Sequence, residues 1–128
     1  MSDAPAGPAR PGWEPLGEDV RRCLELLLPE ADAFLGGYRA QVPYARMHRG
    51  ECSCPCVYLS VDAERVGPAA RPADGRPVAS GSLTDAEGSY LGEAMLFVHD
   101  GFLADLQFCV WEDLGALELP LWERLTPY

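Results

Sequence analysis

The residues best suited to chemistry in this sequence are one histidine and three cysteines within nine positions: His48, Cys52, Cys54 and Cys56. Thiolates and imidazoles are the preferred ligands of zinc, and thiolates also bind copper(I). Closely spaced cysteines can also form disulfides reversibly. This segment is therefore suited either to a metal site for zinc or copper(I), or to thiol redox chemistry.

The geometry of an extended chain argues against a closed metal site in this segment. Alternate residues of a strand lie about 6.6 Å apart, so three neighbouring thiolates cannot share one tetrahedral ion unless the chain bends. Gly50 and Pro55 could supply a bend. The usual zinc pattern has two separate ligand pairs, and this chain has one cluster. We therefore expect no cofactor and a set of reduced structural or surface cysteines, with a zinc or copper(I) site as the alternative.

A second candidate site lies on a predicted β-hairpin that spans residues 90–111. Asp100-Gly101 separates two strand-like runs in the manner of a two-residue type I′ turn. In that register His99 faces Phe102, and the numbers of paired residues sum to 201. The predicted core face carries Leu91, Met95, Phe97, Phe102, Ala104, Leu106, Phe108 and Val110. The predicted mixed face carries Tyr90, Gly92, Ala94, Leu96, Val98, Leu103, Asp105, Gln107, Cys109 and Trp111.

The mixed face contains the best candidates for binding. Tyr90 and Trp111 would form a cross-strand aromatic pair beside Asp105 and Gln107. Aromatic side chains surrounded by polar groups are typical of binding hot spots. The alternative is that the leucine-rich segment after Glu112 covers this face.

No residue is predicted to be catalytic. The carboxylates form no recognised acid-base arrangement, and pairs such as Glu30 and Asp32 suit helix or turn capping. The chain lacks a P-loop, a dinucleotide-binding fingerprint, an H-E-x-x-H pair and a nucleophile elbow. We therefore expect a non-enzymatic protein, although a cofactor-free enzyme with a pocket around His48, Asp62 or Asp105 is a third possibility.

Composition and charge restrict the partners. Twenty acidic and ten basic residues give a net charge of -10, which repels nucleic acids and favours a basic protein partner. No secretory signal and no apolar run of membrane-spanning length is present, so we expect a cytoplasmic protein that binds no membrane. Five cysteines in that compartment are expected to be reduced, without a disulfide framework.

The chain is expected to form one α+β domain over residues 16–128, behind a disordered Pro/Ala/Gly-rich tail over residues 1–15. Apolar residues recur at helical spacing from Glu18 to Ala40, and Pro29 suits the first turn of a second helix. Period-two or β-rich runs predict strands at Tyr44–His48, Val57–Val61, Val78–Leu83 and the two arms of the hairpin. The prediction is one or two N-terminal helices packed on a mainly antiparallel sheet of about four or five strands.

Two segments resemble a group of small uncharacterised actinobacterial proteins. Residues 41–46 match a Q-x-P-x-A-R stretch, and residues 52–62 match a C-G-C-P-S segment that leads into an alternating strand. The residues around Asp100-Gly101 are similar as well. Ser53 and Cys56 depart from the pattern, so only Cys52 and Cys54 correspond to its cysteines. The resemblance supports a single domain and implies no activity.

Together these features favour a small, acidic, cytoplasmic binding protein that is not an enzyme. A toxin-neutralising immunity protein is one form that this function could take, because acidic domains suit basic toxins. The alternative is a metal-binding or redox protein that uses Cys52, Cys54 and Cys56. The sequence makes no prediction of the oligomeric state.

Overall fold

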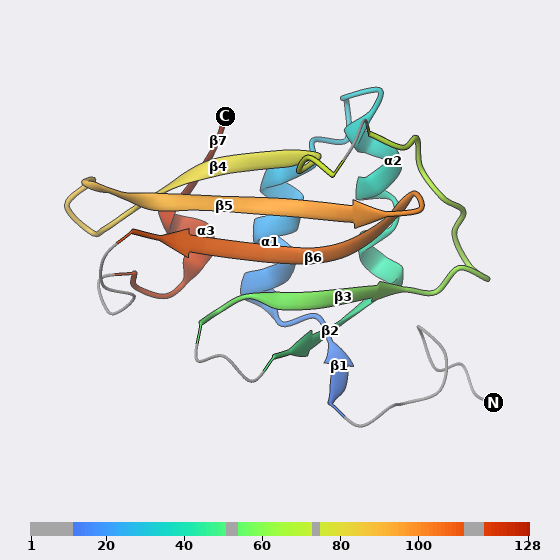
Figure 1. Cartoon of the computed structure of the whole chain (residues 1–128), viewed down its shortest axis with the longest axis horizontal. Coiled ribbons are helices and arrows are strands. Elements are labelled where there is room, and N and C mark those ends of the chain that lie inside the picture. The colour runs from blue at the N-terminus through green and yellow to red at the C-terminus, as the bar shows by residue number, and fades with distance from the viewer. Residues whose placement is uncertain (1–11, 51–53, 73–74, 112–116) are drawn as a thin grey trace.

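The computed structural model describes residues 12–50, 54–72, 75–111 and 117–128. Within these residues, seven strands form one antiparallel sheet in the order β1-β2-β3-β6-β5-β4-β7, and three helices lie on one of its faces (Figure 1). The elements in chain order are β1 (Trp13–Pro15), α1 (Glu18–Leu27), α2 (Leu35–Arg39), the 3-10 turn η1 (Val42–Tyr44), β2 (Ala45–Arg49), β3 (Val57–Val61), β4 (Ala79–Thr84), β5 (Tyr90–His99), β6 (Phe102–Val110), α3 (Leu121–Arg124) and β7 (Leu125–Pro127).

The α+β class is confirmed, and the predicted number of strands is wrong. The five predicted strands all form, but β1 and β7 add one strand at each edge of the sheet. Each of these strands has three residues, which is too short to show an alternating pattern. β1 also corrects the tail boundary, because Trp13–Pro15 pairs with β2. Residues 1–11 of the predicted tail lie outside the described residues.

The apolar stripe of the N-terminal region forms the helical side of the core. Val20, Cys23, Leu24 and Leu27 are the buried residues of α1. The second helix begins at Leu35 rather than at Pro29 as predicted. The Oδ1 atom of Asp32 accepts hydrogen bonds of 2.9 and 2.8 Å from the backbone N–H groups of Phe34 and Leu35. These bonds favour a helix that starts at Leu35, after Asp32.

The central hairpin has the predicted turn and a different register. Asp100 and Gly101 both adopt positive φ, as a type I′ turn requires. His99 pairs with Phe102, and Val98 with Leu103, as predicted. Beyond these pairs the register shifts by one residue, because Ala104 is an extra residue in β6.

This β-bulge reverses the predicted faces of β5 between Gly92 and Val98, whereas a second irregularity before Gly92 leaves Tyr90 on its predicted face. A one-residue shift exchanges the two faces of a strand. Ala94 and Leu96 are therefore buried against the helices, whereas Met95 and Phe97 are only partly buried. In β6 the predicted faces hold beyond the bulge, because Leu106 and Phe108 are buried and Gln107 between them is exposed. Leu103, which was predicted on the mixed face, is buried.

Candidate functional site

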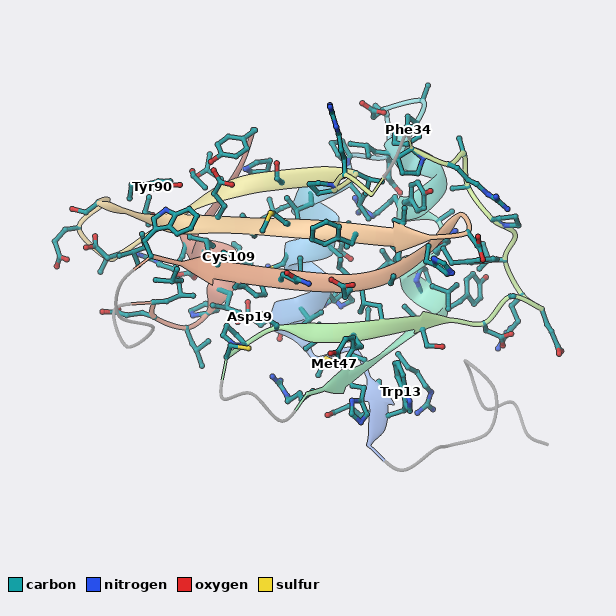
Figure 2. All side chains as sticks on the ribbon, in the orientation of Figure 1. Trp13, Asp19, Phe34, Met47, Tyr90 and Cys109 are labelled. Atoms are coloured by element: carbon teal, nitrogen blue, oxygen red, sulfur yellow. The ribbon has the colours of Figure 1, made fainter. Side chains whose placement is uncertain are left out.

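One face of the sheet is covered by no helix in the described part of the chain (Figure 1). We call it the outer face, since it is turned away from α1, α2 and α3. Figure 2 shows Tyr90 and Cys109 at the end of this face where β5 starts and β6 ends, and Trp13 at the β1 edge. The residues that define the outer face are Trp13, His48, Tyr58, Tyr90, Glu93, Met95, Phe97, Asp105, Gln107, Cys109 and Trp111.

A row of aromatic and polar side chains crosses the outer face from the β1 edge. Trp13 pairs with His48, His48 with Tyr58, Tyr58 with Asp105, and Asp105 with Phe97. The ring centroids of Trp13 and His48 lie 5.3 Å apart, and those of His48 and Tyr58 lie 6.3 Å apart. Five strands thus contribute one residue each to a continuous surface.

His48, the predicted imidazole ligand, is engaged by aromatic rings in this row. Its ring lies between Trp13 and Tyr58, and the five-residue segment from Arg49 separates it in sequence from Cys54. Within the described residues, no group of three or more His, Cys, Asp or Glu side chains could hold a metal ion. Cys52 lies outside the described residues, so the predicted cluster is described only in part.

The oxidation state of the cysteines differs from the prediction. Cys54 is disulfide-bonded, whereas all five cysteines were expected to be reduced. Cys23, Cys56 and Cys109 are free thiols.

A hollow of about 270 Å³ joins the two sites that the sequence predicted separately. Its lining consists of Gly50, Cys54, Cys56, Val57, Tyr58, Asp105 and Gln107. Asp105 and Gln107 are linked by a 3.0 Å hydrogen bond from the Gln107 amide to the Asp105 carboxylate. The Cys56 Sγ atom accepts a 3.3 Å hydrogen bond from the backbone N–H of Phe108, which ties the cysteine segment to β6. The pairing of β3 with β6 brings these segments together.

The predicted aromatic pair forms and is exposed. The Trp111 indole N–H donates a 3.2 Å hydrogen bond to the Tyr90 hydroxyl, and these residues are 64% and 52% exposed. The alternative that the C-terminal segment covers them is wrong for its described part, since α3 and β7 contact α1. Of the four predicted binding residues, Tyr90 and Trp111 lie at one end of the outer face, and Asp105 and Gln107 line the hollow.

Sequence reasoning missed two residues beside this aromatic pair, Glu93 and Tyr128. The Tyr128 hydroxyl donates a 2.9 Å hydrogen bond to the Glu93 carboxylate, and the Tyr90 hydroxyl donates a 3.4 Å bond to the same oxygen. Tyr128 reaches this position because β7 pairs with β4 at the sheet edge. The bulge at Ala104 places Glu93 opposite Cys109 on the outer face. No local signal in the sequence indicates either contact.

Two of the free thiols are not activated as nucleophiles. Burial raises the pKa of Cys23 to about 12, and the nearby Asp19 carboxylate adds to this effect. Burial also raises the pKa of Cys109, with smaller contributions from Cys56 and Glu93. A raised pKa keeps a thiol protonated at neutral pH, and the thiolate is the reactive form.

No protein-family model, curated protein or solved structure matches this chain. Within the described residues, none of the helices combines the length and the apolar character needed to cross a bilayer.

Proposed function

We propose that this chain is a non-enzymatic binding protein whose outer face contacts a partner protein. The observation that supports this proposal is the exposure of three large aromatic residues on one face of the sheet. Tyr58, Tyr90 and Trp111 are 56%, 52% and 64% exposed. Tyrosine and tryptophan are the residue types most enriched at the centres of protein interfaces. Exposure of several such side chains on one face of a sheet is typical of an interaction surface.

The charge of the outer face favours a basic partner. Glu93 and Asp105 form no salt bridge within the described part of the chain. The whole chain has a net charge of -10, which would speed encounter with a basic protein. An immunity protein that neutralises a basic toxin would use such a surface in this way.

Site-specific photo-cross-linking tests this proposal in the cells that make the protein. A photoreactive amino acid at Gln107, which is exposed on the outer face, is expected to give one adduct of defined mass. The matched position is Glu30, which is exposed in the connection between α1 and α2 and should give no adduct.

Two substitutions decide whether the adduct depends on the outer face. Trp111→Ser should abolish it, whereas Leu26→Ser, at an apolar residue of α1 that is 37% exposed, should leave its yield unchanged. The yield should also fall as salt rises, because an electrostatic contribution is screened. Equal adducts from Gln107 and Glu30, or an adduct indifferent to Trp111→Ser, would contradict the proposal.

A second candidate function, thiol redox chemistry, is favoured by the disulfide at Cys54. Cys54 and the free Cys56 line the same hollow, so a disulfide and a thiol lie close together. Equilibration in glutathione buffers followed by maleimide trapping measures the potential of the disulfide. A potential of about -200 to -260 mV would support a redox function, and one below about -300 mV would indicate a structural disulfide. Cys23→Ala is the control, since Cys23 is buried elsewhere.

The metal-binding form of this second candidate requires reduced sulfurs, because zinc and copper(I) bind thiolates. Metal content is therefore measured on freshly purified protein kept under reducing agent. Near-stoichiometric zinc or copper that disappears in a Cys52→Ser/Cys54→Ser double variant would support a metal site. Metal-free protein with unchanged folding of the variant would count against it.

A further inference from the structure

Four residues at one end of the outer face form an aromatic–carboxylate cluster: Tyr90, Glu93, Trp111 and Tyr128. One oxygen of Glu93 accepts hydrogen bonds from the hydroxyls of Tyr128 at 2.9 Å and Tyr90 at 3.4 Å. The Trp111 indole N–H donates to the Tyr90 hydroxyl at 3.2 Å. Three exposed aromatic side chains are thus arranged around a single carboxylate.

The cluster is held in place by the backbone of the sheet. The Trp111 N–H donates a 3.1 Å hydrogen bond to the carbonyl of Leu91, and the Tyr128 N–H donates a 3.1 Å bond to the carbonyl of Ser80. Local desolvation, together with the hydrogen bond to Glu93, raises the pKa of Tyr128 to about 12. Its hydroxyl is therefore protonated at neutral pH and donates to the carboxylate. The geometry exists before any ligand arrives, which lowers the entropic cost of binding.

The charge of the cluster is uncompensated. Glu93 forms no salt bridge within the described part of the chain, and both hydroxyl donors use its Oε2 atom. In the same part of the chain, its Oε1 atom accepts no hydrogen bond from a side chain. A carboxylate attracts a cation by ion pairing, and the face of a nearby exposed aromatic ring adds an attraction through the ring quadrupole.

We propose that the aromatic–carboxylate cluster is a guanidinium site, at which a basic partner presents an arginine side chain. This inference rests on the proposed function and names the chemistry by which the outer face would recognise its partner. Arginine fits better than lysine, because a planar guanidinium can stack on Trp111 or Tyr90 while its N–H groups reach the Glu93 carboxylate. The compact ammonium of lysine can make one of these contacts well, but not both together.

Nuclear magnetic resonance titration of the full chain tests the site with a small probe. N-acetyl-arginine methylamide is added to ¹⁵N-labelled protein, and the indole resonance of Trp111 is followed after its assignment with Trp111→Phe. N-acetyl-citrulline methylamide, a neutral molecule of nearly the same shape, is the matched probe. We expect a saturable shift with arginine and at least about tenfold weaker binding of citrulline, because the ion pair and the cation–π contact are both lost.

Substitutions in the cluster and outside it complete the test. Glu93→Gln should weaken arginine binding at least about fivefold, and Tyr128→Phe, which keeps the ring, should weaken it less. Glu64→Gln makes the same charge change at an exposed residue after β3 and should have no effect. Equal binding of arginine and citrulline, or unchanged arginine binding in Glu93→Gln, would overturn the guanidinium site.

The cross-linking experiment separates this inference from the proposed function. An adduct at Gln107 that persists unchanged in Glu93→Gln would overturn the arginine contact while leaving the partner surface in place. Selective binding of the arginine probe without any adduct would support the guanidinium site and count against the proposed partner. Loss of the adduct in Glu93→Gln, with its retention in Glu64→Gln, would support both the guanidinium site and the proposed partner surface.

Discussion

The side-chain oxygen of Gln41 accepts a 3.0 Å hydrogen bond from the backbone N–H of Leu103, which lies 62 positions further along the chain. The amide nitrogen of Gln41 donates to the carbonyls of Gly101 at 2.8 Å and Gly67 at 3.3 Å. Gln41 is fully buried, so it replaces water for three backbone groups. It therefore holds the hairpin turn directly before the bulge at Ala104.

Gln41→Leu is expected to lower the free energy of unfolding by about 2 to 4 kcal/mol, because the Leu103 N–H and the Gly67 carbonyl lose the Gln41 amide. The Gly101 carbonyl keeps a 2.8 Å hydrogen bond from the backbone N–H of Ala69. Urea denaturation measures the change. Gln107→Leu, at an exposed residue, is the matched control and should shift stability by less than about 0.5 kcal/mol. Similar losses in both variants would contradict a structural role for the buried amide.

Gly92→Ala is expected to destabilise the central hairpin by about 3 kcal/mol or more, or to prevent folding. A β-carbon at this position would collide with the backbone carbonyl of Cys109 on β6, and backbone cannot move aside as a side chain can. Gly67→Ala is the control, since a β-carbon there meets no atom within 4 Å. Thermal unfolding of the two variants measures the difference, and equal melting temperatures would refute the prediction.

Asp19→Ala is expected to cost about 1 to 2 kcal/mol, as other helix caps do. The Asp19 carboxylate accepts hydrogen bonds from the N–H groups of Leu121 at 2.7 Å and Trp122 at 2.9 Å, so it caps α3 from α1. Glu18→Ala is the matched control, because it removes a neighbouring carboxylate whose partner is Arg22 on the surface of the same helix. Chemical denaturation should show a small effect for Glu18→Ala, and an equal effect of both substitutions would argue against the cap.

Stability should fall between about pH 9 and pH 12 through the ionisation of Cys23. The pKa of this thiol is raised from 9.0 to about 12 in the folded chain, so the unfolded chain loses the proton first. The contribution of Cys23 to the free energy of unfolding is complete below pH 9. It is lost at roughly 1.4 kcal/mol per pH unit as the pH rises from there toward the pKa of the folded chain. Urea denaturation across this range should give a shallower decline for Cys23→Ala than for the wild type. Parallel declines would show that Cys23 does not contribute.

The sequence determined the features that depend on near neighbours along the chain. The helical spacing from Glu18, the alternation at Val57–Val61 and the Asp100-Gly101 turn each predicted an element that forms. These signals reflect local backbone preference and a local division between apolar and polar faces. They also predicted the contact between Tyr90 and Trp111, whereas the exposure of this pair was left open by the sequence.

Only the tertiary structure decided the features that depend on distant segments. The bulge at Ala104 lies directly after the contact of Leu103 with Gln41, and no pattern within β6 encodes that contact. The edge strands β1 and β7 are too short to stand alone and form because neighbouring strands offer backbone partners. Pairing with β4 is what brings Tyr128 to Glu93 and completes the aromatic–carboxylate cluster. Such contacts arise from packing in three dimensions, which a one-dimensional pattern does not contain.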